Sequence, residues 1–313
     1  MSALRPRDFI ESDGLLAAVT SVVHAEGPVV TPRYVRERGH LRKLDTVGGR
    51  AYVLERHPEW LLTSPLLGAE IILVPGTRIE RVYRPAARAA ELRATGDGSP
   101  VERRAAGVVS ALVRHDVPDD RIGLTGSVLV GAAGRSSDID VVVYGRAAFA
   151  TARGALGRLV ASGEWREPDE TDWHEAWARR GSPGTFEEYH RHERRKGTKA
   201  IVEGTRLDLS LLQDEGEGTP ERPPYRKLGR LTIEAPVTDA SAAFDLPARY
   251  AVRHALVSEV VSWTATYAGQ ARVGEWVHAC GWLEEDAAGG RRLLLGTSRE
   301  AEGEWLVVRE GAA

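Results

Sequence analysis

The central part of the chain has a pattern of apolar residues that restricts it to a sheet covered by helices. The segment DIDVVVYG (138–145) predicts a strand, and its VVV run is apolar on both faces, so we expect this strand to be buried. Apolar residues three and four positions apart predict helices over 101–114 and 149–163. RIGLTGS (121–127) and TRLDLSLL (205–212) predict two further strands. We therefore expect a sheet with helices packed on it.

The flanking regions are richer in strand signals. Between residues 15 and 79, short apolar runs broken by Gly, Pro and Asp predict a small sheet. These runs include AYVL (51–54) and EIILV (70–74), and a helix is expected near 84–93. ATGDGSP (94–100) has the composition of a linker.

After residue 221 the chain is again β-rich, and the whole chain is predicted to be an α+β protein of three domains. Its 313 residues are enough for a separate core in each domain. The predicted domains are an N-terminal β-rich domain (1–94), a central core (100–215) and a C-terminal β-barrel-like domain (222–313).

Composition indicates the cellular environment of the protein but identifies no ligand. The net charge is −3, from 42 Lys and Arg against 45 Asp and Glu, so any site for a polyanion must be local. A single cysteine, Cys280, excludes a disulfide framework and a thiolate zinc site. Without an apolar run of signal-peptide or membrane-spanning length, we expect a soluble, cytoplasmic protein with no membrane partner.

Two carboxylates project from the same side of the central strand. Side chains alternate along a strand, so Asp138 and Asp140 point one way and Ile139 points into the core. Two carboxylates at this separation repel each other and favour a cation between them. Magnesium takes oxygen ligands and completes its shell with waters or phosphates. We therefore expect this pair to form half of a metal site.

The residues before and after this strand supply what a phosphate site needs. Gly126 permits close approach of the backbone, and Ser127 offers a hydroxyl and an N–H group. Asp208 lies in an otherwise apolar strand, where a charge is costly unless it has a partner or a metal. Neither a G-x-G-x-x-G fingerprint nor a P-loop is present.

These residues resemble the nucleotidyltransferase superfamily typified by DNA polymerase beta. Gly126-Ser127, ten intervening residues, Asp138-Ile139-Asp140 and a later Asp208 carry the resemblance. It implies a polymerase-beta-like core with a mixed sheet backed by helices. It also implies two Mg²⁺ ions and transfer of a nucleoside monophosphate from a nucleoside triphosphate with release of pyrophosphate. It also implies that the three aspartates are catalytic and bind the metal, that Asp208 acts on the attacking hydroxyl, and that Gly126 and Ser127 hold the triphosphate.

One position departs from the pattern of many small members, which have arginine three residues after the serine. Here that residue is Val130, so a cation on the phosphates is missing there. Arg135 or the cluster HERRKGTK, which includes Lys199, is the predicted replacement for nucleotide binding. A solvated helix face is the alternative interpretation of that cluster, and it is the preferred one for His190 and His192.

Over nearly its full length the chain looks like an archaeal family of predicted nucleotidyltransferases, on segments such as RDFIESDGLLAAV and FEEYHRHERRKG. The resemblance leaves the acceptor open. RNA is favoured because of the extra β domains and the basic cluster. The alternatives are a protein or small-molecule acceptor, or a nucleotide- or nucleic-acid-binding protein that has lost turnover. Retention of all three aspartates argues against the last.

Overall fold

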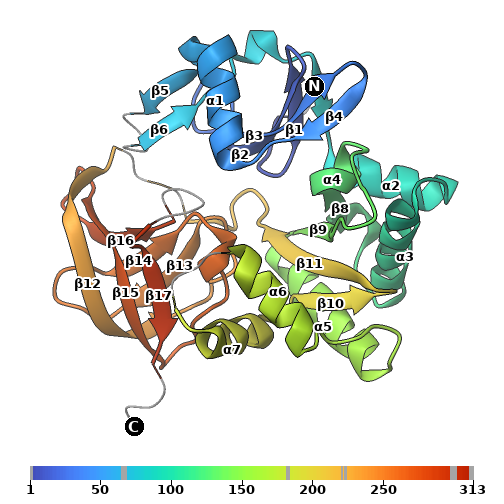
Figure 1. The fold of residues 1–313 in the computed structure, drawn as a ribbon. Helices are drawn as coiled ribbons and strands as arrows, with labels where there is room; N and C mark the ends of the chain where they lie inside the picture. The colour runs from blue at the N-terminus through green and yellow to red at the C-terminus, as the bar shows by residue number, and fades with distance from the viewer. Residues whose placement is uncertain are drawn as a thin grey trace. The chain divides into compact units, whose positions relative to one another are not determined.

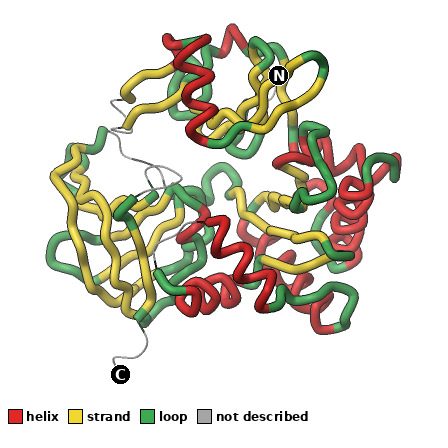
Figure 2. Tube along the Cα trace, viewed as in Figure 1, coloured by secondary structure: helices red, strands yellow, loops and turns green. Residues whose placement is uncertain are grey.

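A computed structural model describes residues 3–64, 69–180, 184–219, 221, 224–296 and 302–309 (Figures 1 and 2). The chain forms two compact units. The first comprises Met1–Ser64, Ala69–Arg166 and Ala200–Ser210, and the second Pro65–Gly68, Glu167–Lys199 and Leu211–Ala313. The α+β class is confirmed.

An antiparallel sheet opens the first unit, with strands in the order β4-β3-β2-β1-β7. Its strands are β1 (Phe9–Ser12), β2 (Leu15–Ser21), β3 (Val29–Glu37), β4 (His40–Lys43) and β7 (Arg81–Tyr83). A second, two-stranded sheet pairs β5 (Leu61–Ser64) with β6 (Ala69–Ile72). Its β6 covers most of the predicted strand at 70–74.

The predicted strand at 51–54 is wrong, because these residues lie in helix α1 (Thr46–Arg56). Asp45 caps this helix by accepting a hydrogen bond from the Gly48 N–H at 2.7 Å. The helix buries Val53 completely against the sheet core. A four-residue apolar run does not distinguish a buried strand from a helix face, and the cap upstream decides between them.

The central sheet has the strand order β10-β11-β9-β8. Its strands are β8 (Ile122–Thr125), β9 (Ile139–Tyr144), β10 (Lys199–Val202) and β11 (Thr205–Leu212). The associated helices are α2 (Pro85–Thr95), α3 (Pro100–Arg114), α4 (Gly126–Leu129) and α5 (Arg146–Ala161). The predictions for β9, β11, α2, α3 and α5 hold, whereas β10 was not predicted.

Residues 94–100 form the turn between α2 and α3. Gly96 ends α2 with a φ of +66°, and Ser99 begins α3 with a capping box to Glu102. Helix α2 packs against both α3 and β8. These residues therefore join two packed helices, and the domain boundary placed there stays a prediction.

The second unit combines a helix pair with a closed barrel. Helices α6 (Glu170–Arg180) and α7 (Phe186–Lys196) pack together, and Thr185 caps α7. The strands are β12 (Arg226–Asp239), β13 (Ala248–Val252), β14 (Glu259–Ser262), β15 (Trp276–Glu285), β16 (Arg291–Leu295) and β17 (Trp305–Val308). Short 3₁₀ turns complete the elements of the chain at Pro58–Trp60, Gly76–Arg78, Asp119–Arg121 and Ala265–Tyr267.

The barrel closes because β12 pairs with both β13 and β15. The order β12-β13-β14-β16-β15 returns to β12, so five strands form a ring, and β17 pairs with the first half of β15. Closure leaves no free edge between these five strands. Tyr250, Val260, Ala279 and Leu293 fill the interior. This confirms the predicted small C-terminal barrel.

Candidate functional site

The turn after β8 brings Gly126 against the carboxylate of Asp140. Strands β8 and β9 are antiparallel, with Thr125 opposite Asp140. Gly126 has a φ of +65°, and a Cβ atom built there would overlap Asp140 Oδ2. Glycine is therefore required at this position both by its backbone and by its neighbour.

Asp138 and Asp140 alternate about a core residue, as predicted. Ile139 is fully buried, and both aspartates are half-buried. Asp138 lies directly before β9 and Asp140 lies within it. Ser127 is half-buried in the short helix α4, where its carbonyl accepts a hydrogen bond from the Ala132 N–H at 2.9 Å. The glycine-serine turn and the aspartate pair thus meet at one end of two paired strands.

The third carboxylate, Asp208, comes from the strand next to β9. Strand β11 neighbours β9, and Ser210 Oγ donates to the Val141 carbonyl at 3.1 Å. Asp208 alternates with the buried Leu207 and Leu209. The negative charges of Asp140 and Asp208 both raise the pKa of the Arg7 guanidinium, which favours its charged form. The topology therefore brings Asp208 to the side of the sheet that carries Asp140.

Two residues of the N-terminal sheet region belong to this site and were missed by sequence reasoning. Burial lowers the pKa of Arg7 from its ordinary value, against the effect of the two aspartates. Burial also raises the pKa of the Tyr34 phenol, and the Asp140 carboxylate adds to that rise. Neither residue stands in a motif, and Arg7 lies more than 110 positions before Gly126. No sequence signal could have placed them here.

The departure at Val130 has a packing explanation. Val130 lies in an apolar cluster with Phe9, Leu16, Tyr34 and Leu129, which joins the N-terminal sheet to the end of α4. An arginine there would bury its charge among apolar side chains. Arg135 is exposed in the loop between α4 and β9, and its nucleotide-binding role stays a prediction.

The donor set fits a hard divalent cation held in part by substrate. Among the described residues, no three His, Cys, Asp or Glu side chains form a ready metal cluster. Magnesium is commonly held by one or two carboxylates, with waters and substrate phosphates as its other ligands. The carboxylate pair of Asp138 and Asp140 suits that arrangement. The metal-binding roles of Asp138, Asp140 and Asp208 stay predictions.

The basic cluster of α7 is largely engaged in ion pairs within the second unit. Arg194 pairs with Glu167 at 2.7 Å, and Arg195 pairs with Glu275 at 2.5 Å. Lys196 is buried and contacts Glu193 at 2.5 Å. Lys199 begins β10, and its Nζ lies 3.6 Å from a Glu193 oxygen. These pairs remove much of the support for an RNA-binding basic face, and the nucleotide-binding role of Lys199 stays a prediction.

The interpretation of His190 and His192 as a solvated helix face is wrong. His192 is buried, and its Nε2 accepts a hydrogen bond from the Val308 N–H at 3.2 Å. His190 is half-buried and stacks on Phe186, with ring centroids 5.7 Å apart. The buried residues of α7 are the polar side chains of His192, Glu193 and Lys196, and His192 and Lys196 bond to partners distant in the sequence, Val308 and Thr266.

His192 should make the second unit less stable in mild acid. Burial, followed by the charges of Arg191, Lys196 and Arg195, lowers its pKa to about 3, against an opposing effect of Glu193. Between pH 6.5 and 3 the unfolded chain binds a proton that the folded chain does not. The free energy of unfolding therefore falls as pH drops through this range.

We expect His192 to account for a loss of about 1 to 2 kcal/mol between pH 7.5 and pH 5. Urea unfolding followed by tryptophan fluorescence measures this loss. His192→Gln, which keeps an acceptor, should reduce the pH dependence by that amount. His174→Gln, at an exposed histidine of α6, should leave it as in the wild type. An unchanged slope in His192→Gln would contradict the prediction.

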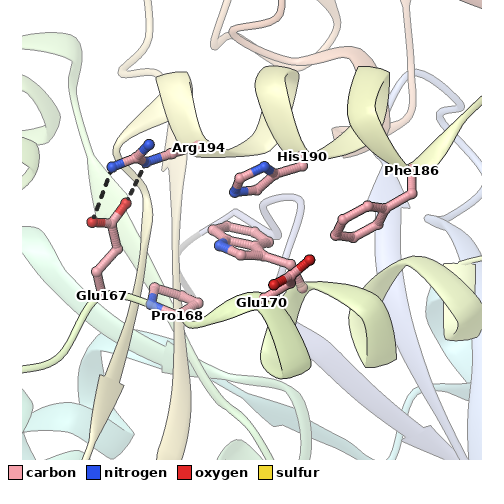
Figure 3. A pocket seen from close by; sticks show the side chains of 7 residues that line it. Glu167, Pro168, Glu170, Phe186, His190 and Arg194 are labelled. Atoms are coloured by element: carbon pink, nitrogen blue, oxygen red, sulfur yellow. Dashed lines mark hydrogen bonds and ion pairs between the residues drawn. The ribbon is translucent and has the colours of Figure 1, made fainter.

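A small pocket lies between α6 and α7 in the second unit (Figure 3). It has a volume of about 270 Å³, and of the residues predicted for nucleotide binding its lining includes Arg194 of the basic cluster. Its lining residues are Glu167, Pro168, Glu170, Trp173, Phe186, His190 and Arg194. Figure 3 shows the Arg194–Glu167 pair at one end of the pocket, with His190 and Phe186 projecting from α7.

In the ranges that the structure describes, no helix has both the length and the apolar character needed to cross a membrane.

Comparison with known proteins gives a match that includes most of the acidic site. The family model described as a nucleotidyltransferase domain matches residues 108–196, which include Gly126, Ser127, Asp138 and Asp140 but end before Asp208.

The chain is also similar to an uncharacterised protein of Methanocaldococcus jannaschii. The two are 29% identical over 337 aligned positions, which cover 98% of this chain and 99% of the other. No solved structure matches the chain. The comparisons therefore indicate a nucleotidyltransferase domain at residues 108–196, which contains the glycine-serine turn and the aspartate pair of the acidic site.

Proposed function

We propose that this protein transfers a nucleoside monophosphate from a nucleoside triphosphate such as ATP to a hydroxyl acceptor, in a reaction that depends on magnesium. The observation that carries the proposal is that several parts of the predicted site come together at Asp140. Its carboxylate lies against Gly126 of the glycine-serine turn. The charge of Asp140 and the charge of Asp208, on the neighbouring strand, also both act on the Arg7 guanidinium.

In the proposed reaction the acceptor oxygen forms a bond to the α-phosphorus. The bond from that phosphorus to the bridging oxygen breaks, and pyrophosphate leaves. Asp208 takes the proton of the attacking hydroxyl, while the Gly126-Ser127 turn holds the triphosphate. A divalent cation bound by Asp138 and Asp140 would neutralise charge on the phosphates.

The assay combines the protein with ATP or CTP labelled at the α-phosphate, magnesium and one acceptor pool at a time. The pools are cellular RNA, soluble protein and small molecules. Wild-type protein is expected to release pyrophosphate and label one pool, and that pool identifies the acceptor. RNA is our preferred acceptor, on the support of the small closed barrel, since small barrels of this size often bind single strands. Labelling of protein or of a small molecule instead would correct this preference.

Asp138→Ala should abolish labelling. The proposal fails if the wild type yields neither labelled product nor pyrophosphate from any pool, and Asp138→Ala binds manganese and nucleotide as tightly as the wild type. That combination would indicate a site that performs no transfer and does not use its carboxylates to bind a metal.

A further inference from the structure

Arg7 occupies a turn before β1 that is fixed to the glycine-serine turn. Its N–H donates to the Val19 carbonyl at 3.0 Å, and its own carbonyl accepts from Thr125 Oγ1 at 3.0 Å. Thr125 directly precedes Gly126. The apolar cluster around Val130 holds the same two parts of the chain together. Arg7 is therefore positioned on the site before any ligand binds.

The backbone of Arg7 adopts a conformation that glycine would adopt more easily. Its φ is +77°, a conformation that is unfavourable for a residue with a side chain. Selection for stability alone would favour glycine at this turn. An arginine there at a cost in stability indicates that the side chain has a use.

The side chain of Arg7 also lacks full hydrogen bonding. Its Nε atom is buried and has no hydrogen-bond partner among the described residues. Leaving such a donor unpaired destabilises the folded protein. The charges that act on its guanidinium are those of Asp140 and Asp208. A half-buried, incompletely bonded cation thus lies near Asp140, which the proposed function assigns to the metal, and near Asp208, which it assigns to the proton of the acceptor.

A cation at this place opposes the binding of a divalent ion to the same aspartates, because like charges repel at short range in a buried site. When a polyanion enters together with the metal, the guanidinium of Arg7 attracts that polyanion. The guanidinium offers a planar fork of donors, which matches the oxygens of a phosphate group. Its position next to the glycine-serine turn is where the proposed function places the phosphates.

We propose that Arg7 binds the triphosphate tail of the nucleotide, as a cation that the N-terminal sheet region supplies to the site. This inference rests on the proposed function and names the side chain that recognises the triphosphate. It also gives the N-terminal region a part in the chemistry, because without that region the site would have no cation at this place.

The test uses the full chain with Arg7→Gln and Arg7→Gly. The second variant relieves the backbone strain, so it keeps the fold while removing the charge. Arg42→Gln is the matched control, since it removes an exposed arginine of β4 that pairs with the surface residue Glu37. Titration calorimetry measures three affinities: a non-hydrolysable ATP analogue with manganese, AMP with manganese, and manganese alone.

Both Arg7 variants are expected to bind the analogue at least tenfold more weakly and AMP within about twofold of the wild type, with manganese alone bound equally or more tightly. Arg42→Gln should match the wild type in all three. If the Arg7 variants bind the analogue as the wild type does while Asp140→Asn loses it, the role of Arg7 is overturned and the proposed function stands. Equal weakening of the analogue and AMP would also overturn it. Absence of manganese-dependent triphosphate binding in the wild type would instead refute the proposed function itself.

Discussion

Asp140→Asn is expected to lower kcat/KM for nucleotidyl transfer by about 10³-fold, which corresponds to about 4 kcal/mol of transition-state stabilisation. The amide keeps the volume of the carboxylate but removes its charge. Asp140 is the aspartate that both touches Gly126 and shares a cation with Asp208. Loss of its charge therefore affects metal, phosphate and Arg7 together. Steady-state release of pyrophosphate measures the effect.

Asp116→Asn is the matched control for this variant. Asp116 is an exposed aspartate of the same unit, and its φ of +69° suits asparagine. It should retain the wild-type rate. Thermal unfolding should show that both variants fold. An Asp140→Asn protein with at least a third of wild-type activity would place the metal and the chemistry away from β9.

Gly126→Ala is expected to lower transfer about 10²-fold, with a smaller loss of stability. The new methyl group would overlap Asp140 Oδ2, so the carboxylate must shift, and a shift of about 1 Å at a reacting group can cost about this much in rate. The positive φ adds backbone strain of roughly 1 kcal/mol. Pyrophosphate release and thermal unfolding measure the two effects.

Gly131→Ala separates the effect of the contact with Asp140 from the effect of backbone strain at a positive φ. Gly131 has a φ of +70°, similar to that of Gly126, but a Cβ there meets no atom within 4 Å. We expect this variant to lose comparable backbone stability and to keep its activity within about threefold of the wild type. Similar losses of activity in the two variants would mean that strain in the turn, and not the contact with Asp140, governs the rate.

The arrangement also explains why the proposed nucleotide site needs more than the segment that matches the nucleotidyltransferase-domain model. That segment ends at residue 196 and lacks Asp208, which the sheet adds through β11. Arg7 and Tyr34 come from before it, brought in by the cluster of Phe9, Leu16 and Val130. Truncation to the matched segment would therefore remove charges that act on Asp140.

Short-range sequence patterns were sufficient to predict part of the fold and part of the candidate site. The alternation of Asp138, Ile139 and Asp140 depends only on the two-residue repeat of a strand, so the sequence placed both carboxylates on one side of β9. The apolar stripe of α3 and the turn glycine Gly126 were likewise readable, since helix period and backbone freedom are local properties. The closed barrel was predicted as a type, but its strand order was not.

The tertiary structure alone decided which distant residues share the site. Arg7 approaches Asp140 and Asp208 because an apolar contact holds the N-terminal sheet on α4, and packing of this kind leaves no periodic trace in either segment. The same holds for α7, whose histidine and basic residues look solvent-exposed in the sequence. His192 and Lys196 are buried there because partners from distant segments, Val308 and Thr266, satisfy their polar atoms. Local chemistry is encoded residue by residue, whereas these burials depend on surfaces that exist only after the chain has folded.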